Sequence, residues 1–188
     1  MHGTIFWQMR DFVEARCGRG SWKNLLKMAG LQDQVYLSRP YPDSEAVALL
    51  TAISTMTSKP LPVTLEEFGQ FTVPSLLTLY GHLIKPEWRT LDVIEHAEGT
   101  AHGMVRREQQ GSAPPYLRTQ RHSPRKVLLF YNSPRKMCSF AVGVGMGLGK
   151  HFQETIIVRH RLCMHHGDDQ CEIIFETLEP SIQAMRPK

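Results

Sequence analysis

A tyrosine, a serine and an arginine occupy alternate positions in the segment Tyr131-Asn132-Ser133-Pro134-Arg135. Alternate side chains of an extended backbone face the same way, so this segment is predicted to present two hydroxyls and one guanidinium on one side. Arginine binds a carboxylate through a planar fork, and hydroxyls can donate further hydrogen bonds to it. The segment therefore predicts a surface for a ligand with two carboxylates, such as the two propionates of haem.

A histidine upstream of this segment could bind the iron of that haem. His102 is flanked by the small residues Ala101 and Gly103, which would let a helix approach a porphyrin face. The competing candidate, His96, precedes it by about 600° of helix rotation, so the two rings lie on faces roughly 120° apart. They cannot serve one iron equivalently, and we predict His102 as the ligand.

Several stretches of the chain resemble the H-NOX family of haem nitric oxide/oxygen-binding domains, with the order and the gaps of that family. They are Met1-His2-Gly3-Thr4-Ile5-Phe6, Phe68-Gly69-Gln70-Phe71, His102, Pro115 after Pro114, and Tyr131-x-Ser133-x-Arg135. The likeness runs from residue 1 to about residue 178. It implies a single H-NOX domain over 1–188, and a stand-alone sensor rather than one module of a larger receptor.

The resemblance also implies a role for each motif residue. His102 would be the proximal ligand of a five-coordinate ferrous haem b, and Pro115 would push the haem out of plane. The propionate cradle would consist of Tyr131, Ser133 and Arg135. We expect further contacts to the haem from Ile5, Met9, Pro74 and Phe140. The residue before the ligand is usually a larger aliphatic one in the family, and Ala101 here departs from that pattern.

The opposite face of the haem determines which gas binds. Family members that hold oxygen stably have a distal tyrosine that donates a hydrogen bond to it, and the matching position here is Phe140. The positions that would support such a tyrosine are Met9 and Pro74, so none of the three is a donor. Nitric oxide needs no such bond. The resemblance therefore implies an NO sensor, with CO as a second ligand.

The expected sensor is not an enzyme. NO binding would break the bond to His102, the haem would relax from the strain near Pro115, and the helical part would rotate on the sheet part. By the resemblance, the partner would be a separate histidine kinase or cyclic-di-GMP enzyme. The sequence leaves the partner and the output open.

A second group of residues could bind zinc. Cys163 and Cys171 flank a predicted turn between two strands, and Cys138 and His160 could converge on them to give a tetrahedral Cys3His site. The spacing resembles a subset of stand-alone H-NOX proteins whose three cysteines and one histidine hold zinc and can oxidise. Either His165 or His166 could replace His160, and four unlinked thiols are the alternative interpretation.

A different class of function remains open. The cysteine-containing hairpin also looks like that of 4-vinyl-reductase-type small-molecule or redox modules, which would use the zinc or thiol cluster without haem. A haem absorption band would favour the sensor, and a colourless zinc protein would favour the module.

The bulk composition fits one globular domain. Hydrophobic residues make up 41% and charged residues 21% of 188 residues. No apolar run reaches the roughly 18 residues of a membrane span, and no secretory signal is evident, so we expect a cytoplasmic protein with free cysteines. The net charge of +4 is too mild to indicate nucleic-acid binding. One basic cluster is interpreted as a solvated connection between strands: Arg118, Arg121, His122, Arg125 and Lys126.

The periodicity predicts an α+β fold, with helices first and a twisted antiparallel sheet after, and a haem cleft between the two parts. We expect a helical subdomain over about 1–62, a haem-binding α/β subdomain over about 63–180, and a tail over 181–188. The predicted helices have an apolar face at Trp7, Met9, Phe12 and Val13, a cap at Ser21 with an end at Gly30, and a start at Asp43. A further helix is predicted to begin with a capping box at Thr64–Glu67 and to be kinked or interrupted at Pro74.

The same reading predicts one helix over about 90–108 that carries His102 and another over about 138–152. Strands are expected at about 116–118, 126–131, 154–163 and 171–177. The glycines at 143, 145, 147 and 149 do not fit the dinucleotide-binding pattern, because Leu148 and Lys150 stand where its last glycine is required. We interpret them as a helix face that passes close to another backbone.

Overall fold

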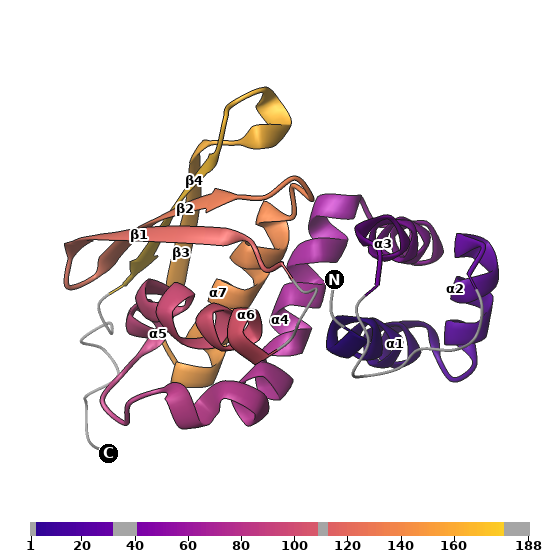
Figure 1. Cartoon of the computed structure of the whole chain (residues 1–188), viewed down its shortest axis with the longest axis horizontal. Coiled ribbons are helices and arrows are strands. Elements are labelled where there is room, and N and C mark those ends of the chain that lie inside the picture. Colours follow the sequence, from indigo (N-terminus) through magenta and orange to yellow (C-terminus); the bar gives the residue numbers. More distant parts are fainter. Residues whose placement is uncertain (1–2, 32–40, 109–112, 179–188) are drawn as a thin grey trace, which may run out of the picture.

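The computed structural model of the chain describes residues 3–31, 41–108 and 113–178. Helices dominate its first half and an antiparallel sheet its second half, so the predicted α+β fold is confirmed (Figure 1). Helices α1 (Gly3–Cys17), α2 (Ser21–Ala29) and α3 (Asp43–Thr57) form one group. The long helix α4 (Leu61–Tyr80) lies between this group and the rest of the molecule.

The helical group has its own hydrophobic core, formed by apolar residues three or four positions apart. The buried side chains that the periodicity predicted are Met9, Phe12, Val13, Leu25, Leu26, Ala46, Leu49, Leu50 and Ile53. Trp7 was predicted to face the core, but Phe6 does so instead. The Trp7 ring lies under the Arg10 guanidinium at 3.7 Å.

The start of α2 differs from the prediction that Ser21 caps it. Gly20 is the N-cap residue, in the left-handed region at φ 87°, and it has no side chain that could cap the helix. The carboxylate of Glu14 instead accepts the amides of Gly20 and Trp22, each at 2.8 Å. Gly30 ends the helix as predicted, at φ 69°.

Helix α4 starts earlier than the sequence predicted, and it does not stop at Pro74. It begins at Leu61 after the N-cap Pro60, so the predicted capping box at Thr64 is wrong, and Thr64 is buried in the first turn. It also continues through Pro74 to Tyr80 without interruption. Proline removes one amide from the helix, and close packing on the neighbouring helix α7 (Cys138–Phe152) holds this stretch in place.

Two glycines allow α4 and α7 to pack closely, as was predicted for Gly143 but not for Gly69. A Cβ atom at Gly143 would collide with the carbonyl of Glu66, and one at Gly69 would collide with the carbonyl of Phe140. These backbones therefore approach more closely than any larger residue would permit. A second hydrophobic core lies between the sheet and the helices that cover it. Because α4 supplies Leu65 and Phe68 to the core of the helical group and Val73 to this second core, it links the two parts of the molecule.

The sheet has four antiparallel strands in the order β1-β2-β4-β3. They are β1 (Tyr116–Ser123), β2 (Lys126–Asn132), β3 (Ile156–Leu162) and β4 (Cys171–Thr177). Alternate residues of the two central strands bury one face against α5 (Thr90–His96) and α7: Val127, Leu129, Tyr131, Cys171, Ile173 and Phe175. All four strands lie where the sequence predicted them, although β1 is longer.

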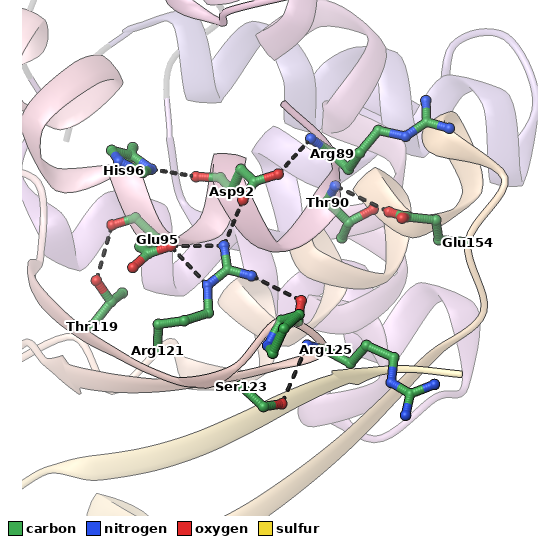
Figure 2. A network of polar contacts seen from close by, with 11 residues as sticks. Arg89, Thr90, Asp92, Glu95, His96, Thr119, Arg121, Ser123, Arg125 and Glu154 are labelled. Atoms are coloured by element: carbon green, nitrogen blue, oxygen red, sulfur yellow. Dashed lines mark hydrogen bonds and ion pairs between the residues drawn. The ribbon is translucent and has the colours of Figure 1, made fainter. Parts of the chain in front are cut away.

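The predicted helix over 90–108 is divided into three helical pieces. After α5, a π-helical turn spans Glu98–His102, and α6 continues over Gly103–Glu108. Figure 2 shows how α5 is fixed to the β1–β2 hairpin by Arg121, whose guanidinium binds Glu95 at 2.8 Å and Asp92 at 2.6 Å. Arg121 is therefore an ion-paired anchor rather than part of a solvated connection.

None of the helices in the described ranges is both long enough and apolar enough to span a membrane.

Candidate cofactor and metal sites

An apolar cavity of about 300 Å³ lies between α4, the π-helical turn, β2 and α7. Six of the predicted haem residues line it: Ile5, His102, Pro115, Tyr131, Arg135 and Phe140. Three others do not line it: Met9, Pro74 and Ser133. The cavity thus brings together the predicted imidazole of His102, guanidinium of Arg135 and phenol of Tyr131 from segments far apart in the chain.

His102 is the last residue of the π-helical turn, and its amide donates to the carbonyl of Ala97 at 3.1 Å. This hydrogen bond joins residues five positions apart, one more than in an α-helix, and so widens the helix at the histidine. Such π-helical turns occur frequently at functional sites. Burial lowers the pKa of the His102 imidazole, against the opposing effects of the Glu98 carboxylate and the Pro115 carbonyl. The ring is therefore neutral near neutral pH and keeps a lone pair for a metal.

The surroundings of His102 are polar on the side away from the cavity. Its Nδ1 lies 3.4 Å from an oxygen of Glu98, and the same carboxylate binds Arg106 and the amide of Leu117. Arg106 also donates to the carbonyl of Pro115 at 3.0 Å. Nothing in the sequence periodicity pointed to Glu98. Its position one turn before His102 is the signal that could have done so.

The segment Tyr131–Arg135 is not extended throughout, which corrects the expectation that its three polar side chains share one strand face. Strand β2 ends at Asn132, and the amide of Lys136 donates to the carbonyl of Ser133 at 3.0 Å in a turn. A proline at the second turn position favours this geometry. The hydroxyl of Ser133 accepts the amide of Arg135 at 3.3 Å and so supports the turn.

Two of the three side chains nevertheless reach the cavity, Tyr131 from the end of β2 and Arg135 from the turn. The guanidinium of Arg135 binds the Asp43 carboxylate at 3.1 and 3.0 Å and the Ala113 carbonyl at 2.5 Å. The Tyr131 hydroxyl accepts the amide of Met137 at 3.1 Å, and burial raises the pKa of this phenol. The phenol therefore keeps its proton and can donate it to an anion.

The wall formed by Phe140 is aromatic and apolar. Its ring packs on Phe68 with a centroid distance of 5.3 Å, and Met9 is fully buried in the adjoining core. Three hydroxyl-bearing residues that the sequence analysis missed also line the cavity: Thr4, Tyr80 and Thr100. The hydroxyl of Thr100 donates to the His96 carbonyl. Tyr80 follows Val73 and Leu77 at helical spacing, a signal that could have placed it on the cavity face.

Three cysteines meet at the other end of the second core. The sulfur atoms of Cys138, Cys163 and Cys171 all lie within 4.8 Å of one another, and all three residues are buried. They come from the first residue of α7, the residue after β3 and the first residue of β4. Burial raises the pKa of both Cys138 and Cys171. Cys17 is exposed and lies outside this cluster.

The cluster lacks the predicted histidine. Across the described parts of the chain, no histidine nitrogen comes within 4.8 Å of all three sulfur atoms. His160 pairs with Ile173, two residues beyond Cys171, so it lies about 7 Å further along the same sheet face. His165 binds the carbonyl of Lys136 at 2.7 Å.

Comparisons with known proteins agree with the fold. A family model described as Haem-NO-binding matches residues 2–160. A crystal structure of an H-NOX protein from S. oneidensis in the Fe(II)NO state is 28% identical, with a TM-score of 0.88 over 95% of this chain and 100% of that one. H-NOX structures from K. algicida and T. Tengcongensis are each 19% identical, with TM-scores of 0.86 and 0.82. They cover 96% and 97% of this chain and 98% and 100% of their own. No curated protein matches.

Proposed function

Because the chain belongs to the Haem-NO-binding (H-NOX) family, we propose that it is a sensor that binds nitric oxide at a ferrous haem b held by His102. Proteins of this family are haem-based gas sensors, and similar structures are described with NO and with CO bound. The observation that carries the proposal is the cavity in which His102, Tyr131 and Arg135 converge.

The residues of the cavity fit a haem. Apolar side chains surround the space that a porphyrin would fill, and His102 presents a neutral ring to it. Arg135 and Tyr131 supply one fixed positive charge and one phenolic proton for the propionates. Arg135 would exchange the carboxylate of Asp43 for a propionate, so the cradle is already arranged around an anion.

His102 would hold the haem, and the haem would supply a ferrous iron that binds NO or CO. The aromatic wall at Phe140 offers no hydrogen-bond donor there. We infer that NO and CO bind and that oxygen does not form a stable complex. The hydroxyls of Thr4 and Tyr80 are the groups that could alter this preference.

We further propose that the chain is a regulator rather than an enzyme. His102, at the end of the π-helical turn, and Pro115, just before β1, would both hold the haem, so a change in how the haem is held would act on both segments. Because α4 links both cores, a shift at the haem would move the helical group relative to the sheet. The output would be a change in a separate cytoplasmic histidine kinase or cyclic-di-GMP enzyme.

A zinc site at the cysteine cluster is a second proposal, supported by the three converging sulfur atoms. Their thiolates would give three of four tetrahedral ligands. His160, which lies on the same sheet face, is the candidate for the fourth, with His165 and His166 as alternatives. Such a site could be structural or could respond to oxidants through its thiols.

The absorption spectrum of the purified, reduced protein tests the haem proposal. We expect an intense Soret band, about one haem per chain, and a shift of that band on adding NO or CO but not air. The family match favours this sensor over a haem-free zinc or thiol module of the 4-vinyl-reductase type. A colourless protein that takes up zinc but no haem would contradict the proposal and support that module.

A further inference from the structure

Glu98 connects the candidate iron ligand to the sheet through one carboxylate. One oxygen of Glu98 lies 3.4 Å from Nδ1 of His102 and accepts the amide of Leu117 at 3.1 Å. The other oxygen binds the guanidinium of Arg106. The side chain of Glu98 is 32% exposed and that of His102 is 23% exposed, so these contacts are only partly screened by solvent.

The contact to Nδ1 favours metal binding through the other nitrogen of His102. A neutral imidazole carries one proton, and a carboxylate acceptor keeps that proton on the nearer nitrogen. Nε2 then holds the lone pair, and the ring lines the cavity. A carboxylate acceptor behind a metal-bound histidine also fixes the orientation of the ring and makes it a stronger donor to the metal.

The remaining contacts of Glu98 connect His102 to segments that follow it in the chain. Leu117 is the second residue of β1, so the carboxylate anchors the π-helical turn to the start of that strand. Arg106 extends the link, because it also donates to the carbonyl of Pro115 at 3.0 Å. Displacement of His102 would therefore shift Glu98, and with it the hydrogen bonds to Leu117 and, through Arg106, to Pro115.

We propose that Glu98 is a positioning residue for His102, which strengthens the bond from Nε2 to iron and connects the position of the histidine to β1. The inference rests on the proposed function, because it assumes that His102 is the iron ligand. It adds that the strength of that bond, and hence the ease with which NO breaks it, is set by an acidic side chain of the π-helical turn.

The test compares three variants in the haem-loaded protein. Glu98→Gln keeps the size of the side chain but removes its charge, and Glu98→Ala removes the acceptor. Glu95→Gln is the matched control, because Glu95 also pairs with an arginine of this region but binds Arg121 and not His102. The readouts are the iron–histidine stretching band in the resonance Raman spectrum of the ferrous protein and the rate at which this bond is lost after adding NO.

We expect the stretching band to move to lower frequency in Glu98→Gln and further in Glu98→Ala, with the parent frequency in Glu95→Gln. Loss of the histidine bond after NO addition should become about 10-fold faster in Glu98→Ala, the lower end of what removal of such an outer partner costs. An unchanged frequency and rate in both Glu98 variants, with haem and fold retained, would overturn the inference.

Two controls separate this result from other failures. A parent protein with no iron–histidine band would refute the His102 assignment itself rather than the role of Glu98. Far-ultraviolet circular dichroism of each variant shows whether its fold is kept. If Glu98→Ala fails to fold, Glu98→Gln alone decides, since its amide fills the same space.

Discussion

The haem cavity and the cysteine cluster differ in how their functional groups are partnered. In the cavity, His102 contacts Glu98, and Arg135 pairs with Asp43. In the cluster, the thiols of Cys138 and Cys171 lie 3.9 and 4.0 Å from that of Cys163. Carboxylates of the chain thus partner functional groups of the cavity. In the cluster the thiols contact one another, and the sulfur of Cys171 also accepts the amide of Met164 at 3.3 Å.

This difference predicts different roles for the two ligands. Haem would enter a cavity whose polar groups exchange one partner for another, so the fold around it can form without the cofactor. Zinc would displace protons from buried thiols and join three separate elements, so its binding free energy would add directly to the stability of the hairpin. The cluster is therefore expected to depend more strongly on its ligand than the cavity does.

The largest expected effect is on the cluster. Replacing Cys163 or Cys171 with serine should abolish the binding of about one zinc per chain and loosen the hairpin between β3 and β4. Metal analysis after purification under reducing conditions measures the zinc, and thermal unfolding measures the stability. Cys17→Ser is the matched control and should change neither. Unchanged zinc content in both cluster variants would refute the site.

The pH dependence of zinc binding should also separate the two sites. Burial raises the pKa of Cys138 and Cys171, and zinc requires their thiolates. Zinc affinity should therefore fall steeply as the pH is lowered through neutrality, because protons compete for sulfur. Titration with a zinc indicator at several pH values measures this. A zinc affinity independent of pH would contradict thiol ligation.

A smaller effect is expected in the propionate cradle, where Arg135→Ala should accelerate haem loss more than Ser133→Ala does. A charge-assisted hydrogen bond contributes about 1.5 to 3 kcal/mol and a neutral hydroxyl about 0.5 to 1.5 kcal/mol. The order should appear in rates of haem transfer to an acceptor protein. Asp43→Asn is the informative control, because it removes the competing carboxylate and should slow haem loss. Faster loss in Ser133→Ala than in Arg135→Ala would reverse the assignment.

The smallest expected effect concerns the gas-binding wall. Phe140→Tyr places a phenol on the wall of the cavity and should give a measurable but weak affinity for oxygen, seen as a new absorption spectrum in air. Tyr80→Phe tests the natural hydroxyl in the cavity and should leave the parent's lack of oxygen binding unchanged. A stable oxygen complex in the unaltered protein would contradict the NO preference.

Much of this arrangement could be predicted from the sequence, because it depends on local patterns. Helix α7, strand β4 and the inward positions of α3 follow from periodicity that no distant contact alters. The capping pattern predicts a start of α4 at Thr64, but the helix begins at Leu61, between Pro60 and Pro62. Proline suits the first turn of a helix, where an amide would have no partner.

The candidate site was less predictable for a physical reason. His102 and Arg135 could be predicted from their residue types, but the π-helical turn is held by hydrogen bonds that the amide of Leu117 and the guanidinium of Arg106 donate to Glu98. Only the folded chain brings these groups together. The turn after Asn132 could have been recognised from Pro134, since proline favours the second position of such a turn.

The central claim is that His102 binds the iron of a haem in this cavity, and the His102→Gly variant tests it most directly. The account predicts that the purified variant lacks the Soret band and that expression with imidazole, which can replace the lost ring in the cavity, restores it. His96→Gly, in which the altered ring packs on Trp88 away from the cavity, should keep the parent spectrum. A His102→Gly protein that holds haem with the parent spectrum in the absence of imidazole would contradict the account.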